Sequence, residues 1–180
     1  MEVVRSMGER DPGIRVVARV FILNEHAELL LLKNRTGRIW VPPGGTLELG
    51  ETLVSAAARE AREEVGIDVT VGRLAAVREF RPAHRPEQVV ELDFLARATR
   101  DQPGADEVES GRVEPGGGPN RPWQTWFIRD VDGLRREVRW FTREQLAAAP
   151  EPVVPALLRD HFWDLDWAAA DPYLGLEEAR

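Results

Sequence analysis

Three glutamates near the middle of the chain have the spacing of a divalent-metal site. Glu60, Glu63 and Glu64 lie at positions i, i+3 and i+4, which share one face of an α-helix. Like charges at such spacings oppose helix formation by about 0.2–0.5 kcal/mol per pair, and a hard cation with oxygen ligands would offset that cost. A solvated acidic face is the alternative, and Arg59 supports it because it can pair with Glu63 at i, i+4. The glutamates alone leave both interpretations open.

The residues around these glutamates favour a site over an ordinary amphipathic helix. Trp40-Val-Pro-Pro-Gly-Gly precedes the helix, and Gly44 and Gly45 allow the backbone to approach a ligand closely. Thr52 is the expected N-cap, and Gly66 is the expected left-handed residue that ends the helix. A separate stripe of small or apolar residues, repeating every four positions, is expected to pack on a sheet: Leu53, Ala57, Ala61 and Val65.

This segment resembles the Nudix box, the pattern Gx5Ex7REUxEExGU in which U is aliphatic. The fixed positions that match are Gly45, Glu51, Arg59, Glu60, Glu63, Glu64, Gly66 and Ile67. The one departure is Ala61, where the pattern prefers a larger aliphatic residue. Because Ala61 lies in the packing stripe, we expect the change to affect packing and to leave the chemistry in place.

The resemblance implies a hydrolase that cleaves a diphosphate linkage with Mg²⁺ or Mn²⁺ as its cofactor. It implies that Glu60 and Glu64 bind the metal directly, helped by Glu63 and the Gly44 carbonyl. It also implies that Glu51 lies farther from the metal and often contacts it through a water molecule. It also implies that Arg59 orients the box glutamates. Metal ions neutralise charge on phosphate oxygens and lower the pKa of a bound water, so water is the expected nucleophile.

The catalytic residues implied by the resemblance are Glu63, Arg59 and Glu60. A general base in this family is usually another carboxylate, and Glu63 is our first choice. Alternatives outside the box are Glu87 and Glu91, near a candidate substrate loop, and Glu137, before a predicted strand. His84 is expected to be an exposed loop residue.

Candidate substrate contacts lie outside the box. Arg78, Arg81 and Arg85 flank one loop and are either a phosphate clamp or ordinary surface charge. Trp123 and Trp126 could stack on a nucleobase. The alternative is that they anchor the end of a loop to the sheet. We favour this anchoring role because aromatic side chains are chiefly packing residues.

The order of predicted elements indicates an α/β fold. Apolar and β-branched runs predict strands over residues 14–23, 29–32, 69–80, 88–98 and 138–141. Helical spacing predicts the box helix, a short helix over 143–148 and a last helix over 153–167. This order predicts a mixed sheet between helices, an α/β/α sandwich, which the Nudix resemblance also implies.

One domain is expected over residues 14–168, between a flexible N-terminus (1–13) and a C-terminal tail (169–180). Residues 101–122 contain five glycines, four prolines and five acidic residues, which predicts a long loop or a disordered insert. Such an insert is either a mobile lid over the substrate or a tolerated insertion, and we favour the insertion.

Composition excludes several other classes. The net charge of −7 argues against binding a nucleic-acid polymer, because that affinity depends on clustered positive charge. No apolar run approaches the roughly 20 residues of a membrane span, so we expect no membrane partner and a cytoplasmic location. The expected partner is a small nucleotide, and the expected assembly is a monomer or a homodimer.

Two further function classes were weighed against hydrolysis. The absence of cysteine argues against a related isomerase of isoprenoid diphosphates, which uses a cysteine in its usual form. A non-catalytic Nudix-like module that senses a nucleotide stays an alternative. Such a module is expected to have lost box glutamates and to carry an extra interaction domain, and the box here is intact.

Overall fold

The computed structural model describes residues 13–83, 86–130 and 132–177 of the 180-residue chain, with side chains described as far as residue 174. Within these ranges the strands form one ten-stranded sheet in the order β10-β5-β6-β1-β2-β9-β8-β7, with β3 paired to β2 and β4 paired to β1. The strands are β1 (Ile14–Leu23), β2 (Leu29–Lys33), β3 (Trp40–Val41), β4 (Gly44–Thr46), β5 (Val69–Phe80), β6 (Gln88–Ala98), β7 (Val113–Pro115), β8 (Thr125–Arg129), β9 (Arg135–Phe141) and β10 (Tyr173–Glu177). The helices are α1 (Leu53–Val65), α2 (Ala105–Glu109), α3 (Arg143–Ala147) and α4 (Leu157–Asp160).

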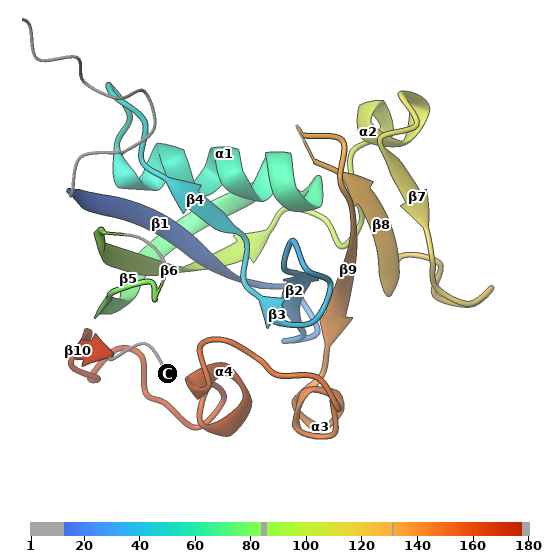
Figure 1. Ribbon diagram of the computed structural model, residues 1–180. Helices are drawn as coiled ribbons and strands as arrows, with labels where there is room; N and C mark the ends of the chain where they lie inside the picture. The colour runs from blue at the N-terminus through green and yellow to red at the C-terminus, as the bar shows by residue number, and fades with distance from the viewer. Residues whose placement is uncertain (1–12, 84–85, 131, 178–180) are drawn as a thin grey trace, which may run out of the picture.

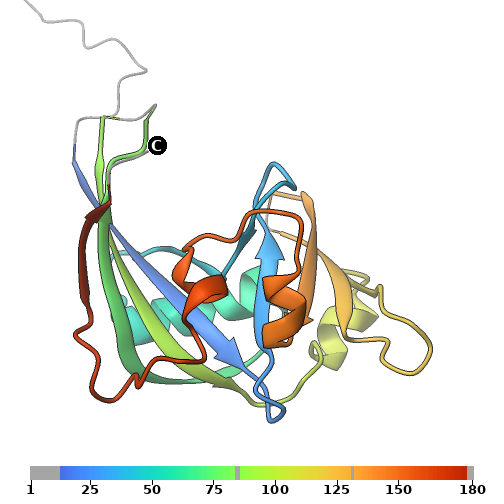
Figure 2. The ribbon, with the colours of Figure 1, turned by 90° about the horizontal axis from the view of Figure 1, so that it is seen from below.

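The sheet is mixed and lies between two layers of helix. β1 runs parallel to β6, and β10 runs parallel to β5, whereas the other paired strands are antiparallel. Figure 1 shows α1 along one face of the sheet and α3 and α4 on the other, and Figure 2 shows these two short helices in front of the sheet. The predicted α/β/α sandwich is confirmed.

The central strands are apolar throughout because both of their faces are covered. Leu30 and Leu32 of β2 belong to the core under α1, while Leu29 and Leu31 belong to the core under α3 and α4. All four side chains are 0% exposed, and burial of each contributes about 1.5–3 kcal/mol. Burial on both faces thus holds β2 between the two helical layers.

Helix α1 begins and ends as its sequence predicts. Thr52 caps its N-terminus: the Ser55 amide donates to Thr52 Oγ1 at 3.1 Å, and the Thr52 amide donates to Ser55 Oγ at 2.9 Å. Gly66 ends the helix in the left-handed region at φ 73°. Four residues of its packing face are buried against the sheet, namely Ala56, Ala57, Ala61 and Val65.

Two side chains from beyond β6 complete the last turn of α1. Arg112 donates to the carbonyl oxygens of Arg62 at 2.9 Å and Glu63 at 2.7 Å, and Trp126 Nε1 donates to the Val65 carbonyl at 3.0 Å. Carbonyls at the end of a helix have no partner within it, and a cationic side chain there also favours the helix dipole. The end of the box helix is therefore bound by a segment that follows it by about 50 residues.

The segment over residues 101–122 contains more regular structure than its composition suggests. It carries α2 and the three-residue strand β7, which pairs with Trp126, Phe127 and Ile128 of β8. Both elements are short, so no apolar period is long enough to show in the sequence. The segment 169–180, expected as a tail, includes β10 beside β5 at the sheet edge (Figure 2).

The predicted last helix over residues 153–167 is wrong. Only Leu157–Asp160 is helical, and turns follow it. Pro155 disfavours helical backbone in the residue before it, and Val153 forms a bridge to Trp40 instead. The apolar spacing arose because Leu158, within α4, and Phe162, in the turn that follows, both pack into the core under α3 and α4. Within the described residues, no helix has the length and apolar character needed to cross a membrane.

Candidate active site

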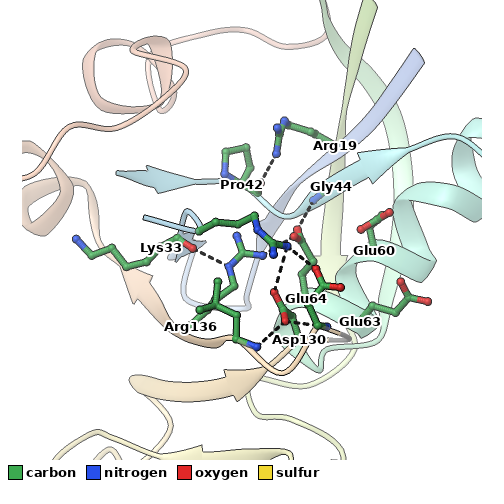
Figure 3. A network of polar contacts seen from close by, with 12 residues as sticks. Arg19, Lys33, Pro42, Gly44, Glu60, Glu63, Glu64, Asp130 and Arg136 are labelled. Atoms are coloured by element: carbon green, nitrogen blue, oxygen red, sulfur yellow. Dashed lines mark hydrogen bonds and ion pairs between the residues drawn. The ribbon is translucent and has the colours of Figure 1, made fainter. Parts of the chain in front are cut away.

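The box glutamates line a cavity of ≈ 530 Å³ between α1, β4 and two hairpin turns. Glu60, Glu63 and Glu64 approach it from α1, and Asp130 and Asp132 approach it from the β8–β9 turn. Figure 3 shows Glu60, Glu63, Glu64 and Asp130 gathered beside Gly44 and Arg136. The predicted face of carboxylates is therefore part of a cavity wall.

Arg59 is the centre of the ion pairs on this wall. Its Nε donates to Glu51 at 2.7 Å, and its Nη1 donates to Glu60 at 2.8 Å and to Glu63 at 3.1 Å. The i, i+4 pair expected from the spacing is thus present. Because one guanidinium holds three carboxylates, it fixes the orientation of the whole face.

Glu64 is held from the opposite side, by β4 and β9. The Gly44 amide donates to Glu64 Oε2 at 2.8 Å, and Arg136 Nη1 donates to Glu64 Oε1 at 2.5 Å (Figure 3). Arg136 is 6% exposed, and its Nε also donates to the Lys33 carbonyl at 2.8 Å. The sequence interpretation missed Arg136 because the predicted strand began at residue 138. The alternation that puts Arg136 on the face of the buried Val138 is the signal that could have found it.

Two carboxylates that Arg59 binds, those of Glu60 and Glu51, have pKa values shifted in opposite directions. Burial raises the pKa of Glu60; the hydrogen bond from Arg59 opposes the rise, and the Glu64 and Glu63 charges add to it. In contrast, the Arg59 hydrogen bonds lower the pKa of Glu51 to about 2. The charged form of Glu60 is thus less favoured here than in water, and a nearby cation would stabilise it.

The residues present fit a hard divalent cation. Among the described residues, ion pairs join four carboxylates, of Glu51, Glu60, Glu63 and Glu64, to two guanidinium groups, those of Arg59 and Arg136. All candidate ligand atoms are oxygens, as Mg²⁺ and Mn²⁺ prefer. A Cβ added at Gly45 would lie 2.2 Å from Glu60 Oε1, so only glycine lets that carboxylate lie on the backbone.

A second acidic group lies away from this cavity. Among the described residues, Glu25, His26 and Asp101 are the one trio whose potential ligand atoms all lie within 4.8 Å of one another. Glu25 and His26 side chains are 79% and 61% exposed, so water competes for the same positions. The group stands at the β1–β2 turn, at the far end of β2 from the cavity, and does not belong to the box site.

Two of the predicted substrate contacts are wrong. Arg78 is 2% exposed and donates to Asp93 at 2.9 Å and to Glu91, so it is held inside the sheet and not at a phosphate. Trp126 is 0% exposed, and its indole is bound to the end of α1. A buried ring offers no face to a base, and the anchoring role is the one that its contacts fit.

The remaining predicted contacts have different surroundings. Trp123 is half-buried and lines a separate cavity of ≈ 230 Å³ with His26 and Asp101. Arg81 is exposed directly after β5, and Arg85 lies outside the described residues, as does His84. Neither Trp123 nor Arg81 lines the cavity of the box.

The alternative general bases are also outside that cavity. Glu91 is 1% exposed and accepts from Arg19 and Arg78. Glu87 pairs with Arg15 at 3.2 Å, and Glu137 lines a neighbouring cavity of ≈ 330 Å³. Glu63 lines the main cavity with its side chain 42% exposed.

Comparison with known proteins agrees with this geometry. The family model described as the NUDIX domain matches residues 13–160. The chain belongs to the Nudix family.

Relatives of this Nudix chain have several names. A protein of Bacillus subtilis (strain 168), provisionally named an 8-oxo-dGTP diphosphatase, is 34% identical over 97 residues, which are 54% of this chain and 62% of that protein. Nudix hydrolase 2 of Arabidopsis thaliana is 32% identical over 130 residues, 67% of this chain and 45% of that protein. The 8-oxo-dGDP phosphatase NUDT18 of Homo sapiens is 39% identical over 87 residues, 47% of this chain and 25% of that protein. The chain therefore spans less than two thirds of each of these relatives.

Solved structures share the Nudix fold. A NUDIX hydrolase from Nitrosomonas europaea superposes with a TM-score of 0.56 at 21% identity, covering 98% of this chain and 84% of that one. The MutT protein from Methanosarcina mazei Go1 gives 0.55 at 22% identity, covering 86% of this chain and 94% of that one. At these identities the likeness concerns the fold alone.

Proposed function

We propose that this Nudix chain hydrolyses a pyrophosphate bond in a nucleoside diphosphate linked to another moiety, with Mg²⁺ or Mn²⁺ as its cofactor. Candidate substrates are nucleoside triphosphates, ADP-ribose and nucleotide sugars. The observation that carries the proposal is the set of three box carboxylates on one cavity wall, Glu60, Glu63 and Glu64, with Glu51 joined to them through Arg59. The names of the relatives add 8-oxo-dGTP to the compounds worth testing.

The residues of the cavity would have different roles in such a reaction. Glu60 and Glu64 would hold the cation with the Gly44 carbonyl, and Glu51 would support them through Arg59. Once bound, the cation would neutralise phosphate charge and lower the pKa of a water molecule. Arg59 keeps Glu60 and Glu63 in fixed orientations through hydrogen bonds of 2.8 and 3.1 Å.

Glu63 is the best placed residue to accept the proton of the attacking water. Its side chain is 42% exposed, compared with 12% for Glu60 and 19% for both Glu51 and Glu64. A general base must reach the water whose proton it takes, and Glu63 is the box carboxylate most open to the cavity. Arg59 contacts only one of its oxygens, Oε2.

The test is a substrate panel with the purified full chain. Nucleoside triphosphates, 8-oxo-dGTP, ADP-ribose and nucleotide sugars would be incubated with Mg²⁺, with Mn²⁺ or with a chelator, and products separated by chromatography. We expect cleavage at a pyrophosphate only with metal, and ¹⁸O from labelled water in one phosphate product. Glu64→Gln should abolish it, while the matched control Glu109→Gln, on the exposed face of α2, should not.

Two results would count against the proposal. Cleavage that continues in the chelator would remove the metal from the reaction. Nucleotide binding without turnover of any compound would favour the sensing module instead.

A further inference from the structure

Arg19 connects the interior of the sheet to the turn in front of the box helix. Its Nε donates to Glu91 at 2.5 Å, and its Nη1 donates to the Pro42 carbonyl at 2.9 Å (Figure 3). Its aliphatic stem lies against the backbone of the same turn, because a Cβ added at Gly44 would be 2.5 Å from Arg19 Cγ. Arg19 thus contacts the Pro42–Gly44 turn by both its charged end and its stem.

This turn holds one of the box glutamates. The Gly44 amide donates to Glu64 Oε2 at 2.8 Å, and β4 pairs with β1 so that Gly44 stands opposite Arg19. The neighbouring Pro43 carbonyl accepts from the Val20 amide at 3.0 Å. A displacement of the turn would therefore move both the Gly44 backbone and the carboxylate that it holds.

Arg19 has little freedom because its acceptor is buried and fixed. Glu91 is 1% exposed and also accepts from Arg78, which donates to the fully buried Asp93 at 2.9 Å. Hydrogen bonds between buried charged groups are strong, and leaving one group without its partner is costly. The chain Asp93–Arg78–Glu91 therefore determines where the Arg19 guanidinium lies.

We propose that Arg19 is a positioning residue that sets the divalent-metal affinity of the box by fixing the Pro42–Gly44 turn. This inference rests on the proposed function only for the identity of the metal site. Loss of an outer partner of a metal ligand typically weakens metal affinity about 10–100-fold. We expect an effect at the lower end, about tenfold, because Pro43 keeps its own bond to β1.

The test compares Mn²⁺ binding by Arg19→Met and Arg15→Met, measured from the electron paramagnetic resonance signal of free Mn²⁺. Arg15 is the matched control because it lies on β1 four residues before Arg19, pairs with Glu87 directly before β6, and does not line the cavity. Arg19→Met should bind Mn²⁺ about tenfold more weakly, whereas Arg15→Met should bind it as the parent does. Arg19→Lys keeps the stem and the charge but replaces the fixed planar fork of the guanidinium with a single ammonium nitrogen. Its Mn²⁺ affinity should therefore lie between those of the two methionine variants.

A double variant separates positioning from folding. Arg19→Met leaves Glu91 with one guanidinium partner fewer, so Arg19→Met/Glu91→Gln removes the extra charge and leaves the Arg78–Asp93 pair. We expect it to unfold cooperatively and to show the same weakened Mn²⁺ binding. Parent-like Mn²⁺ affinity in the folded double variant would overturn the inference.

Kinetics distinguish a direct contact from positioning. If Arg19→Met raises KM for the nucleotide while Mn²⁺ affinity is unchanged, Arg19 touches the substrate and the positioning role is wrong. If the parent cleaves no compound of the panel yet its Mn²⁺ affinity depends on Arg19, the positioning role stands and the proposed hydrolysis fails.

Discussion

Two clusters of arginines and carboxylates in this protein differ in charge balance and in access to water. The box cluster joins Arg59 and Arg136 to four glutamates, of which Glu60, Glu63 and Glu64 line the cavity and Glu51 lies behind Arg59. The buried cluster joins Arg19 and Arg78 to Glu91 and Asp93 between β1, β5 and β6. Counted over the ion pairs of the described residues, the box cluster has two more carboxylates than guanidinium groups, whereas the buried cluster has two of each.

The difference separates a binding site from a structural network made of the same residue types. Buried ions need full pairing, since the cost of removing them from water is otherwise not recovered. The buried cluster meets that need within the chain. The box cluster does not, and its excess charge faces a cavity where a cation can enter. Four predictions sharpen or break this contrast.

The largest effect is expected for Glu60→Gln in the box cluster. Hydrolysis should fall roughly a thousandfold, about 4 kcal/mol of transition-state stabilisation, because a charge that holds the cation is lost. The free energy of unfolding should not fall, since burial and two acidic neighbours already disfavour the charged form. Turnover assays and urea denaturation of the same samples check both halves. A stable variant with most of its activity would break the contrast.

The next effect is expected for Asp93→Ala in the buried cluster. Unfolding free energy should fall by about 3 kcal/mol, because Arg78 loses a partner where both are buried. Urea denaturation in the absence of metal measures it. The exposed pair Arg143–Asp164, at 2.5 Å, supplies the control: Asp164→Ala should cost less than about 1 kcal/mol. Equal losses at the two sites would show that burial does not distinguish them.

Metal should stabilise the protein through the box cluster alone. At a Mg²⁺ concentration of about 100 times its Kd, unfolding free energy should rise by about 2.7 kcal/mol. Thermal denaturation with and without Mg²⁺ tests this in the parent chain and in Glu60→Gln. Glu60→Gln should lose most of this stabilisation. A parent Tm that does not change when Mg²⁺ is added would contradict the metal site.

The smallest effect is the acid response of Glu51. Arg59 lowers the pKa of Glu51 from the ordinary value of 4.5 to about 2. The Glu51 charge therefore stabilises the folded state fully at pH values above 4.5. That gain should be lost as pH falls from about 4.5 to about 2. The parent should therefore be more stable than Glu51→Gln at pH 7, and the difference should close over that range in denaturation curves. A difference that is constant with pH would mean that packing, not charge, is responsible.

The box could be predicted from the sequence because its geometry is local. One helix contains all of its determinants: the Thr52 cap, the Gly66 end, and the spacing of Glu60, Glu63 and Glu64. Within a helix, the period of 3.6 residues per turn determines which side chains are neighbours. The partners of that helix could not be predicted in this way. Arg136 lies 72 positions from Glu64, and Arg19 lies 72 positions from Glu91, and no local pattern encodes such contacts.

The sequence could not exclude Arg78 and Trp126 as substrate contacts, for the same physical reason. An arginine within a strand has the same sequence signal whether it faces solvent or a buried carboxylate on the next strand. Only the register, which places Arg78 opposite Glu91, decides between them. For Trp126, the deciding contact is a carbonyl of α1, 61 positions earlier.

Arg112 and Trp126 donate to carbonyl oxygens in the last turn of α1, and this affects any transfer of the helix into another scaffold. A graft of residues 45–67 would carry all eight matching positions of the Nudix pattern, yet it would leave behind the side-chain donors to three of its last carbonyl groups. The recipient would have to supply an arginine and an indole at matching places, or its grafted helix would fray at the end that carries Glu63 and Glu64. The portable unit is thus the box together with the two strands, β7 and β8, that bring those donors to it.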